Sequence, residues 1–158
     1  FAEGMANLHK MGIVETLRKE VMENKKPYLG ICLGMQMLAS KGHEFGTTEG
    51  LGFIPGEGKR FDLASQGLKV PHMGWNEIVL KGNNPLFKHL GKDKAFYFVH
   101  SYNMWPESRD VVIATCDYGG EFVAAIQKDN IIGLQFHPEK SQRNGLGFLE
   151  NFLEWKHA

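Results

Sequence analysis

The 158-residue sequence predicts an α/β fold in which helices cover both faces of a mixed central sheet. The first observation is a short apolar run at 28–32, bounded by proline and glycine and lying between two helical patterns, as is typical of a strand buried on both faces. The second is a set of β-rich runs, at 95–102, 111–118, 121–128 and 130–137, followed by a helical pattern. This order of elements favours a layered α/β architecture.

Helical patterns occupy three parts of the chain. Apolar residues recur between charged ones over 4–24, which predicts an amphipathic helix interrupted at Gly12. The stretch 33–40 predicts the next helix, ended by Gly42, and 146–156 predicts the last one.

The middle of the chain has a different character. The closely spaced glycines of 46–62 and the run 69–80 predict short strands and turns in an antiparallel excursion, and 84–90 predicts a helical turn. Asp129 and Asn130 stand between two β-rich runs and predict the tip of a hairpin.

Composition limits the function classes. The 18 basic and 18 acidic residues balance, and no block of like charge indicates binding to nucleic acid or to a membrane surface. No apolar run approaches the roughly 20 residues of a membrane span, and two cysteines are too few for a disulfide framework, so we expect a cytoplasmic protein. The length predicts a single domain over 1–158.

Cys32 lies in a G-x-C-x-G frame with Gly30 and Gly34, which is the pattern of a nucleophile elbow with cysteine in the serine position. At such a turn the flanking glycines relieve crowding, and the backbone N–H of the next residue, Leu33, points at the developing oxyanion. A cysteine without such a frame is more often a small buried hydrophobe. We therefore expect Cys32 to be the nucleophile and Cys116 to be structural.

A thiol nucleophile needs a base, and six of the seven histidines lack a nearby carboxylate that would orient the ring. His137 is held by Pro138 and has Glu139 two residues on, so both side chains point the same way at a strand end. An isolated His-Pro-Glu is more often a surface loop, but together with the elbow it predicts a Cys-His-Glu triad. We expect this histidine and the helix N-terminus after Cys32 to favour the thiolate.

The segments "GICLGMQ" and "FHPEKS" resemble the class I, triad-type glutamine amidotransferases. The segments "PHMGWN", "FYFVHSY" and "QFHPEKSQ" narrow the resemblance to the glutaminase subunits of imidazole glycerol phosphate synthase, which serve histidine biosynthesis. The resemblance implies that glutamine is hydrolysed to glutamate and ammonia through a thioester on Cys32, with His137 as general acid/base, Glu139 as its orienting partner, and no cofactor or metal.

The same resemblance implies further site residues and the extent of the fold. Positions that hold the substrate glutamine in the family correspond here to Gln36, Glu44, Ser101 and Tyr102. Relatives carry a glycine-rich oxyanion segment and the first strands of the sheet before the point where this chain begins, so we expect an N-terminally truncated amidotransferase domain.

The ammonia acceptor implied by the resemblance is a (β/α)8-barrel cyclase subunit, which forms a heterodimer with the glutaminase. Trp75, Tyr97 and Lys140 correspond to family positions at that interface. From the residues alone, two aromatic side chains in β-rich runs are more often core, and Lys140 is more often a solvated charge.

Three alternatives stay open at this point. A paralogue with the same chemistry would supply ammonia to another synthase, for example one that aminates or amidinates a surface-polysaccharide sugar. An inactive amidotransferase-fold module would only bind a partner, although all three triad residues are present. A general cysteine hydrolase or peptidase is disfavoured by Gln36 and the "HSY" segment.

Overall fold

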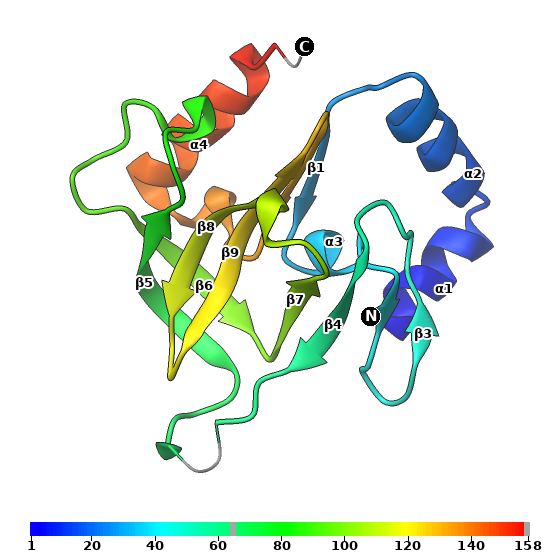
Figure 1. Ribbon diagram of the computed structural model, residues 1–158, viewed down its shortest axis with the longest axis horizontal. Coiled ribbons are helices and arrows are strands. Elements are labelled where there is room, and N and C mark those ends of the chain that lie inside the picture. Colours follow the sequence, from blue (N-terminus) through cyan, green and yellow to red (C-terminus); the bar gives the residue numbers. More distant parts are fainter. Residues whose placement is uncertain (64–65, 157–158) are drawn as a thin grey trace.

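A six-stranded mixed sheet forms the centre of the structure, a computed structural model that describes residues 1–63 and 66–156 (Figure 1). Its strand order is β1-β10-β9-β8-β5-β6. The strands are β1 (Tyr28–Ile31), β10 (Ile131–Leu134), β9 (Glu121–Lys128), β8 (Val112–Asp117), β5 (His72–Leu80) and β6 (Ala95–His100). β1 pairs in parallel with β10, and the following neighbours pair antiparallel. The predicted hairpin is confirmed, because Lys128 pairs with Ile131 across Asp129 and Asn130.

A second sheet of four strands has the order β3-β2-β4-β7. The strands are β2 (Lys41–Gly42), β3 (Thr48–Glu49), β4 (Gly56–Arg60) and β7 (Tyr102–Pro106). The expected antiparallel pairing holds for β2 with β3 and for β4 with β7, but β2 and β4 are parallel. The chain reverses twice before β4 pairs with the free side of β2, so these two strands run in the same direction.

The helices cover both faces of the six-stranded sheet, as predicted. The longer ones are α1 (Ala2–Lys10) and α4 (Gln142–Glu154), and the shorter ones are α2 (Val14–Leu17), the π-helix η1 (Arg18–Glu23) and α3 (Leu33–Gln36). Single 3₁₀ turns are η3 (Pro85–Phe87), η4 (Arg109–Val111) and η5 (Pro138–Lys140). Figure 1 shows α4 and the α1–α2 pair on opposite sides of β1.

The predicted helix over 33–40 is wrong, because α3 ends at Gln36. The carbonyls of residues 37–40 accept hydrogen bonds from amides of the loop at 50–54, for example Leu51 to Met37 at 2.8 Å and Gly50 to Ser40 at 2.8 Å. The loop approaches so closely that a Cβ on Gly50 would lie 2.1 Å from a carbonyl oxygen. Tertiary hydrogen bonds therefore replace the helical ones.

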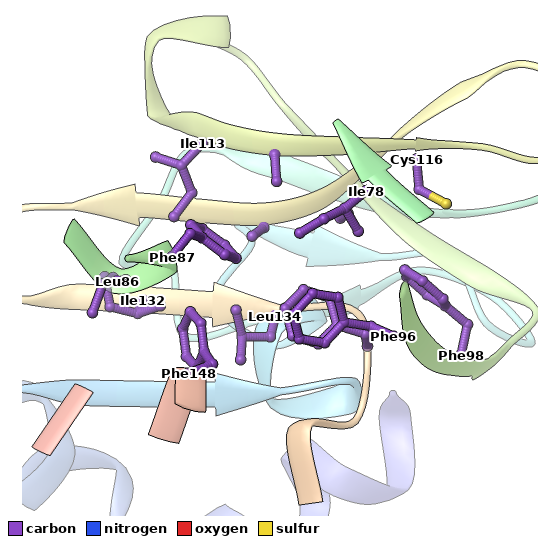
Figure 2. Packing of buried hydrophobic residues seen from close by; sticks show 14 of the residues in the cluster. Ile78, Leu86, Phe87, Phe96, Phe98, Ile113, Cys116, Ile132, Leu134 and Phe148 are labelled. Carbon is purple, nitrogen blue, oxygen red and sulfur yellow. The ribbon is translucent and has the colours of Figure 1, made fainter. Parts of the chain in front are cut away.

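Two apolar clusters fill the two faces of the sheet. Figure 2 shows the first, which includes Phe148 of α4 together with Phe96 and Leu134. The second contains Met5 of α1 and Val21 of η1. Side chains of β10 alternate between them, with Ile131 in the second cluster and Ile132 and Leu134 in the first, as expected of a strand covered on both faces.

Two buried histidines, His72 and His100, lie beside each other at the end of the β5–β6 pair. His100 Nδ1 lies 2.8 Å from the carbonyl oxygen of Tyr102, which can only accept, so this nitrogen carries the proton. His100 Nε2 then accepts from His72 Nδ1 at 3.1 Å. Burial lowers the pKa of both side chains to about 4, so both are neutral near pH 7.

We expect this pair to make the protein less stable in acid. Unfolded histidines take up protons as the pH falls below about 6.5, whereas these two resist protonation until about pH 4. The unfolded state therefore binds more protons in this window, and the free energy of unfolding decreases as the pH falls from about 6.5 to 4. Urea unfolding at several pH values measures this slope. His100→Gln keeps a donor and an acceptor and should make the free energy of unfolding depend less on pH. His9→Gln, at an exposed position of α1, is the control and should leave this dependence unchanged. Equal slopes in the wild type and both variants would contradict the assignment of the pH dependence to the buried pair.

Candidate active site

Cys32 occupies a strained turn between β1 and α3. Its backbone has φ 51° and ψ −105°, a sparsely populated positive-φ conformation that costs a non-glycine residue about 1–3 kcal/mol. The turn is held because the Cys32 amide donates to the Leu134 carbonyl at 2.6 Å. A Cβ on Gly30 would lie 2.7 Å from the Gly34 carbonyl oxygen, so the elbow needs glycine there. Gly34 has open space instead, so the prediction that both glycines relieve crowding is wrong for Gly34.

His137 and Glu139 form a close pair just after β10. His137 Nδ1 lies 2.7 Å from Glu139 Oε1. The other ring nitrogen, Nε2, is buried and has no hydrogen-bond partner among the described residues. The ring is therefore oriented by the carboxylate and keeps one nitrogen for another group.

The expectation that the other histidines lack a carboxylate is wrong for His43. Its Nε2 lies 3.1 Å from Glu57 Oε2, and its Nδ1 lies 3.3 Å from the Thr47 hydroxyl. The parallel pairing of β2 with β4 creates this contact between residues 14 positions apart, which local spacing could not reveal. His43 is absent from the lining of the cavity beside Cys32.

Strand β6 brings Cys32 and His137 to the same place, although it is the far edge strand of the sheet. The His137 amide donates to the Tyr97 carbonyl at 2.9 Å, and Cys32 Sγ lies 3.9 Å from the Val99 carbonyl. Tyr97 and Val99 are two positions apart on β6, so the two carbonyls that contact His137 and Cys32 are about 7 Å apart. Within the described chain, no hydrogen bond joins Cys32 Sγ to His137 Nε2.

The resting thiol of Cys32 is neutral, contrary to the expectation of a favoured thiolate. Burial raises the pKa of Cys32 above its usual value, and hydrogen bonds from the Leu33 amide and the Gln135 side chain oppose that rise only in part. The Glu139 charge raises this pKa further. The two expected stabilisers of a thiolate add little, because α3 has a single turn and His137 is not hydrogen-bonded to the sulfur. Burial raises the pKa of Cys116 to about 12, as expected of a structural thiol.

A cavity of about 600 Å³ opens beside Cys32. The four residues that the sequence assigns to glutamine all line it, namely Gln36, Glu44, Ser101 and Tyr102. The lining also includes Arg60, so one acidic and one basic side chain face the same space. The Glu44 carboxylate contacts the backbone nitrogen of Phe1. His137 does not line this cavity.

Gln135 is a site residue that the sequence interpretation missed. Its side chain is fully buried and donates from Nε2 to Cys32 Sγ at 3.6 Å. Its Oε1 accepts from Gln36 Nε2 at 3.1 Å. The sequence contained one indication of this role. Gln135 precedes His137 by two positions after the same buried strand, and side chains two positions apart in an extended chain point the same way.

The three residues assigned to a partner interface lie together. Trp75 and Tyr97 are register partners on β5 and β6, their ring centroids are 6.1 Å apart, and Trp75 is 48% exposed. Lys140 Nζ lies 6.0 Å from the Tyr97 ring centroid. Met73, 61% exposed, is on the same face of β5. We call these four residues the β5–β6 patch.

The described residues contain no helix that is long and apolar enough to cross a membrane.

Comparisons with known proteins agree with this geometry. The family model described as glutamine amidotransferase class-I matches residues 2–155. The imidazole glycerol phosphate synthase subunit HisH 1 of Campylobacter jejuni (strain 81-176) is 49% identical over 152 residues, which cover 96% of this chain and 75% of that protein. The subunit HisH of Geobacter sulfurreducens is 48% identical over 99% of this chain and 76% of that protein.

Solved structures are similar at lower identity. A putative GMP synthase protein from Thermoplasma acidophilum has a TM-score of 0.63 at 19% identity, over 92% of this chain and 65% of that one. A glutamine amidotransferase from Thermotoga maritima has a TM-score of 0.58 at 20% identity, over 92% of this chain and 53% of that one. These structures support the α/β fold, and the family match with its HisH relatives settles the membership. The chain belongs to the class I glutamine amidotransferase family and, within it, to the HisH subunits.

Proposed function

We propose that this chain is the glutaminase subunit of imidazole glycerol phosphate synthase. It hydrolyses glutamine to glutamate and ammonia and passes the ammonia to a cyclase subunit for histidine biosynthesis. The observation that carries the proposal is the His137–Glu139 pair at 2.7 Å, whose second ring nitrogen is buried and unpartnered among the described residues, at the strand ends where Cys32 forms the elbow. Both cysteines are free, which fits a reducing compartment such as the cytoplasm.

The reaction begins when Cys32 Sγ attacks the side-chain amide carbon of glutamine. Because the resting thiol is neutral, its proton must leave during the attack, and His137 Nε2 takes it. Glu139 stabilises the resulting imidazolium. His137 then returns the proton to the amide nitrogen, ammonia leaves, and a glutamyl thioester forms on Cys32. Water activated by His137 hydrolyses the thioester and releases glutamate.

The oxyanion of each tetrahedral intermediate needs hydrogen-bond donors beside the sulfur. The Leu33 amide already donates toward Cys32 Sγ, so it is close to the place where the oxyanion develops. Leu33 is the first residue of α3, and its N–H has no helical carbonyl to bind. Leu33 is therefore our candidate donor.

Gln36 can meet the substrate only as an acceptor. Both of its N–H groups are used, one by the Tyr102 carbonyl at 2.8 Å and one by Gln135 Oε1 at 3.1 Å. Its Oε1 is therefore the atom free to accept a hydrogen bond from an N–H of glutamine. Glu44 and Arg60, of opposite charge on the cavity wall, suit the ammonium and carboxylate of a free amino acid.

The partner is a (β/α)8-barrel cyclase that forms a heterodimer with this chain through the β5–β6 patch. The patch adjoins the triad, because Tyr97 carries the carbonyl that holds the His137 amide. Exposed aromatic and methionine side chains are typical of an interface centre. Ammonia released at Cys32 would then be close to the partner.

Reconstitution tests this function. We expect ammonia release from glutamine to rise at least about 10-fold when a cyclase barrel and its nucleotide are added, because closure over an active site often limits its turnover. Trp75→Ala should lose most of this rise and weaken copurification. Trp105→Ala is the matched control, since Trp105 is 54% exposed on the other sheet, and it should behave as the wild type.

The same experiment separates the alternatives. Ammonia release that no cyclase enhances would point to a paralogue that serves another synthase. Copurification without any ammonia release, even with partner and nucleotide, would point to an inactive binding module.

A further inference from the structure

Gln135 connects the nucleophile to the wall of the glutamine cavity. It follows β10, its amide donates to the Ala124 carbonyl at 2.9 Å, and its side chain is fully buried. The side-chain amide then bridges Cys32 Sγ, 3.6 Å from its Nε2, and Gln36, 3.1 Å from its Oε1. Burying a side-chain amide costs free energy unless both of its ends are hydrogen-bonded. Here the sulfur of Cys32 is one of the two partners that satisfy the Gln135 amide.

A chain of fixed donors sets the orientation of this amide. The Tyr102 carbonyl can only accept, so the group of Gln36 that faces it at 2.8 Å is the amino group. The same amino group faces Gln135, which must therefore present its oxygen to Gln36. Its own amino group is left facing Cys32 Sγ. The flipped amide would place two amino groups against each other and an oxygen against the sulfur.

We propose that Gln135 is a catalytic residue that donates a hydrogen bond to the sulfur of Cys32 and stabilises its thiolate. The proposal rests on the proposed function in taking Cys32 as the nucleophile. A hydrogen bond to the charged form of a group favours that form, and bonds to charged groups are stronger than those between neutral groups. The amide donor therefore acts mainly once the proton has passed from Cys32 Sγ to His137 Nε2.

The same bond assists the second half of the reaction. A thioester sulfur is a poor acceptor, so the bond from Gln135 weakens when the acyl group is attached. When the tetrahedral intermediate of hydrolysis collapses, the carbon–sulfur bond breaks and its electron pair stays on Sγ. The hydrogen bond from Gln135 to this thiolate then strengthens again. Gln135 thus stabilises both attack by the thiolate and its departure, and it does so without adding a charge to the buried site.

The pH dependence of Cys32 alkylation tests this proposal. The full chain is treated with iodoacetamide over a pH series, and the labelled cysteine is identified by peptide mass analysis, so that Cys116 is counted separately. Gln135→Met keeps the shape and removes the donor, and it should raise the apparent pKa of Cys32 by about one unit, which is about 10-fold less thiolate at a given pH. Gln127→Met is the matched control, because Gln127 on β9 binds Asn84 instead and should leave the pKa unchanged.

A second variant covers the case in which Gln135→Met does not fold by circular dichroism. Gln36→Met leaves Gln135 in place but removes the group that fixes its orientation, so it should raise the pKa of Cys32 by a smaller amount. An unchanged pKa of Cys32 in the folded variants would overturn the proposal. Alkylation needs no glutamine turnover, so a shifted pKa in a protein that releases no ammonia even with the cyclase and its nucleotide would support Gln135 as the donor and refute the glutaminase function separately.

Discussion

Cys32→Ala is expected to abolish ammonia release from glutamine while the protein stays folded and bound to its cyclase. Alanine keeps the Cβ and the backbone of the elbow but removes the atom that forms the thioester. Loss of a nucleophile at a triad lowers kcat by at least about 10³-fold and can lower it by about 10⁶-fold. The measurement is ammonia release in the presence of the cyclase and its nucleotide, with circular dichroism and copurification on the same sample.

Cys116→Ala is the control for this variant. Cys116 is buried in β8, its thiol pKa is raised to about 12, and it lies in the apolar cluster with Ile78 and Phe122. Its replacement should lower stability by about 1 kcal/mol through the lost sulfur packing and leave turnover unchanged. If Cys32→Ala instead lost partner binding together with activity, Cys32 would be a structural residue and the elbow interpretation would be wrong.

Local patterns in the sequence predicted the parts of the site that local geometry determines. Gly30 is needed because a Cβ there would clash with backbone atoms of Gly34 and Met35. These two residues are only four and five positions away in the sequence. The His137–Glu139 contact follows from spacing at a strand end, and the hairpin at Asp129 follows from its two turn residues. In each case the partners are close in sequence, so residue type and spacing carry the information.

Contacts between distant residues could not be predicted in the same way. The end of α3 depends on amides of the loop at 50–54, and the His43–Glu57 contact depends on the pairing of β2 with β4. The neutral state of Cys32 depends on how deeply the folded chain buries its sulfur, which outweighs the donors around it. These features arise only when the sheets assemble.

Only the His137–Glu139 contact of the triad is formed in the resting structure. That contact needs only the short turn η5, whereas Cys32 Sγ and His137 Nε2 are not hydrogen-bonded although the ends of β1, β10 and β6 already meet. Hydrogen bonds of a catalytic base are often completed only when substrate is bound. We therefore place the missing contact, between Sγ and Nε2, in the complex with glutamine.

Gly30→Ala should unfold the elbow, and Gly34→Ala should not. In the G-x-C-x-G frame both positions look equivalent, but a Cβ on Gly30 would lie 2.7 Å from the Gly34 carbonyl oxygen and 2.9 Å from the Met35 nitrogen. These are backbone atoms of α3 and cannot move aside without shifting the helix. Overpacking of this kind costs about 1–3 kcal/mol or more, a large part of a typical stability of about 5–15 kcal/mol.

Gly34 offers the matched control, because a Cβ added there would enter open space with no described atom within 4 Å. Alanine there also favours the helical turn of α3 by up to about 1 kcal/mol. Urea unfolding should therefore show a lower midpoint for Gly30→Ala and an equal or higher one for Gly34→Ala. Alkylation of Cys32 should follow the same order, because a shifted α3 moves the Leu33 amide away from the sulfur. Equal loss of stability in both variants would mean that the frame needs glycine at both positions for backbone freedom. The close approach of α3 to β1 would then not be the reason that the elbow requires glycine.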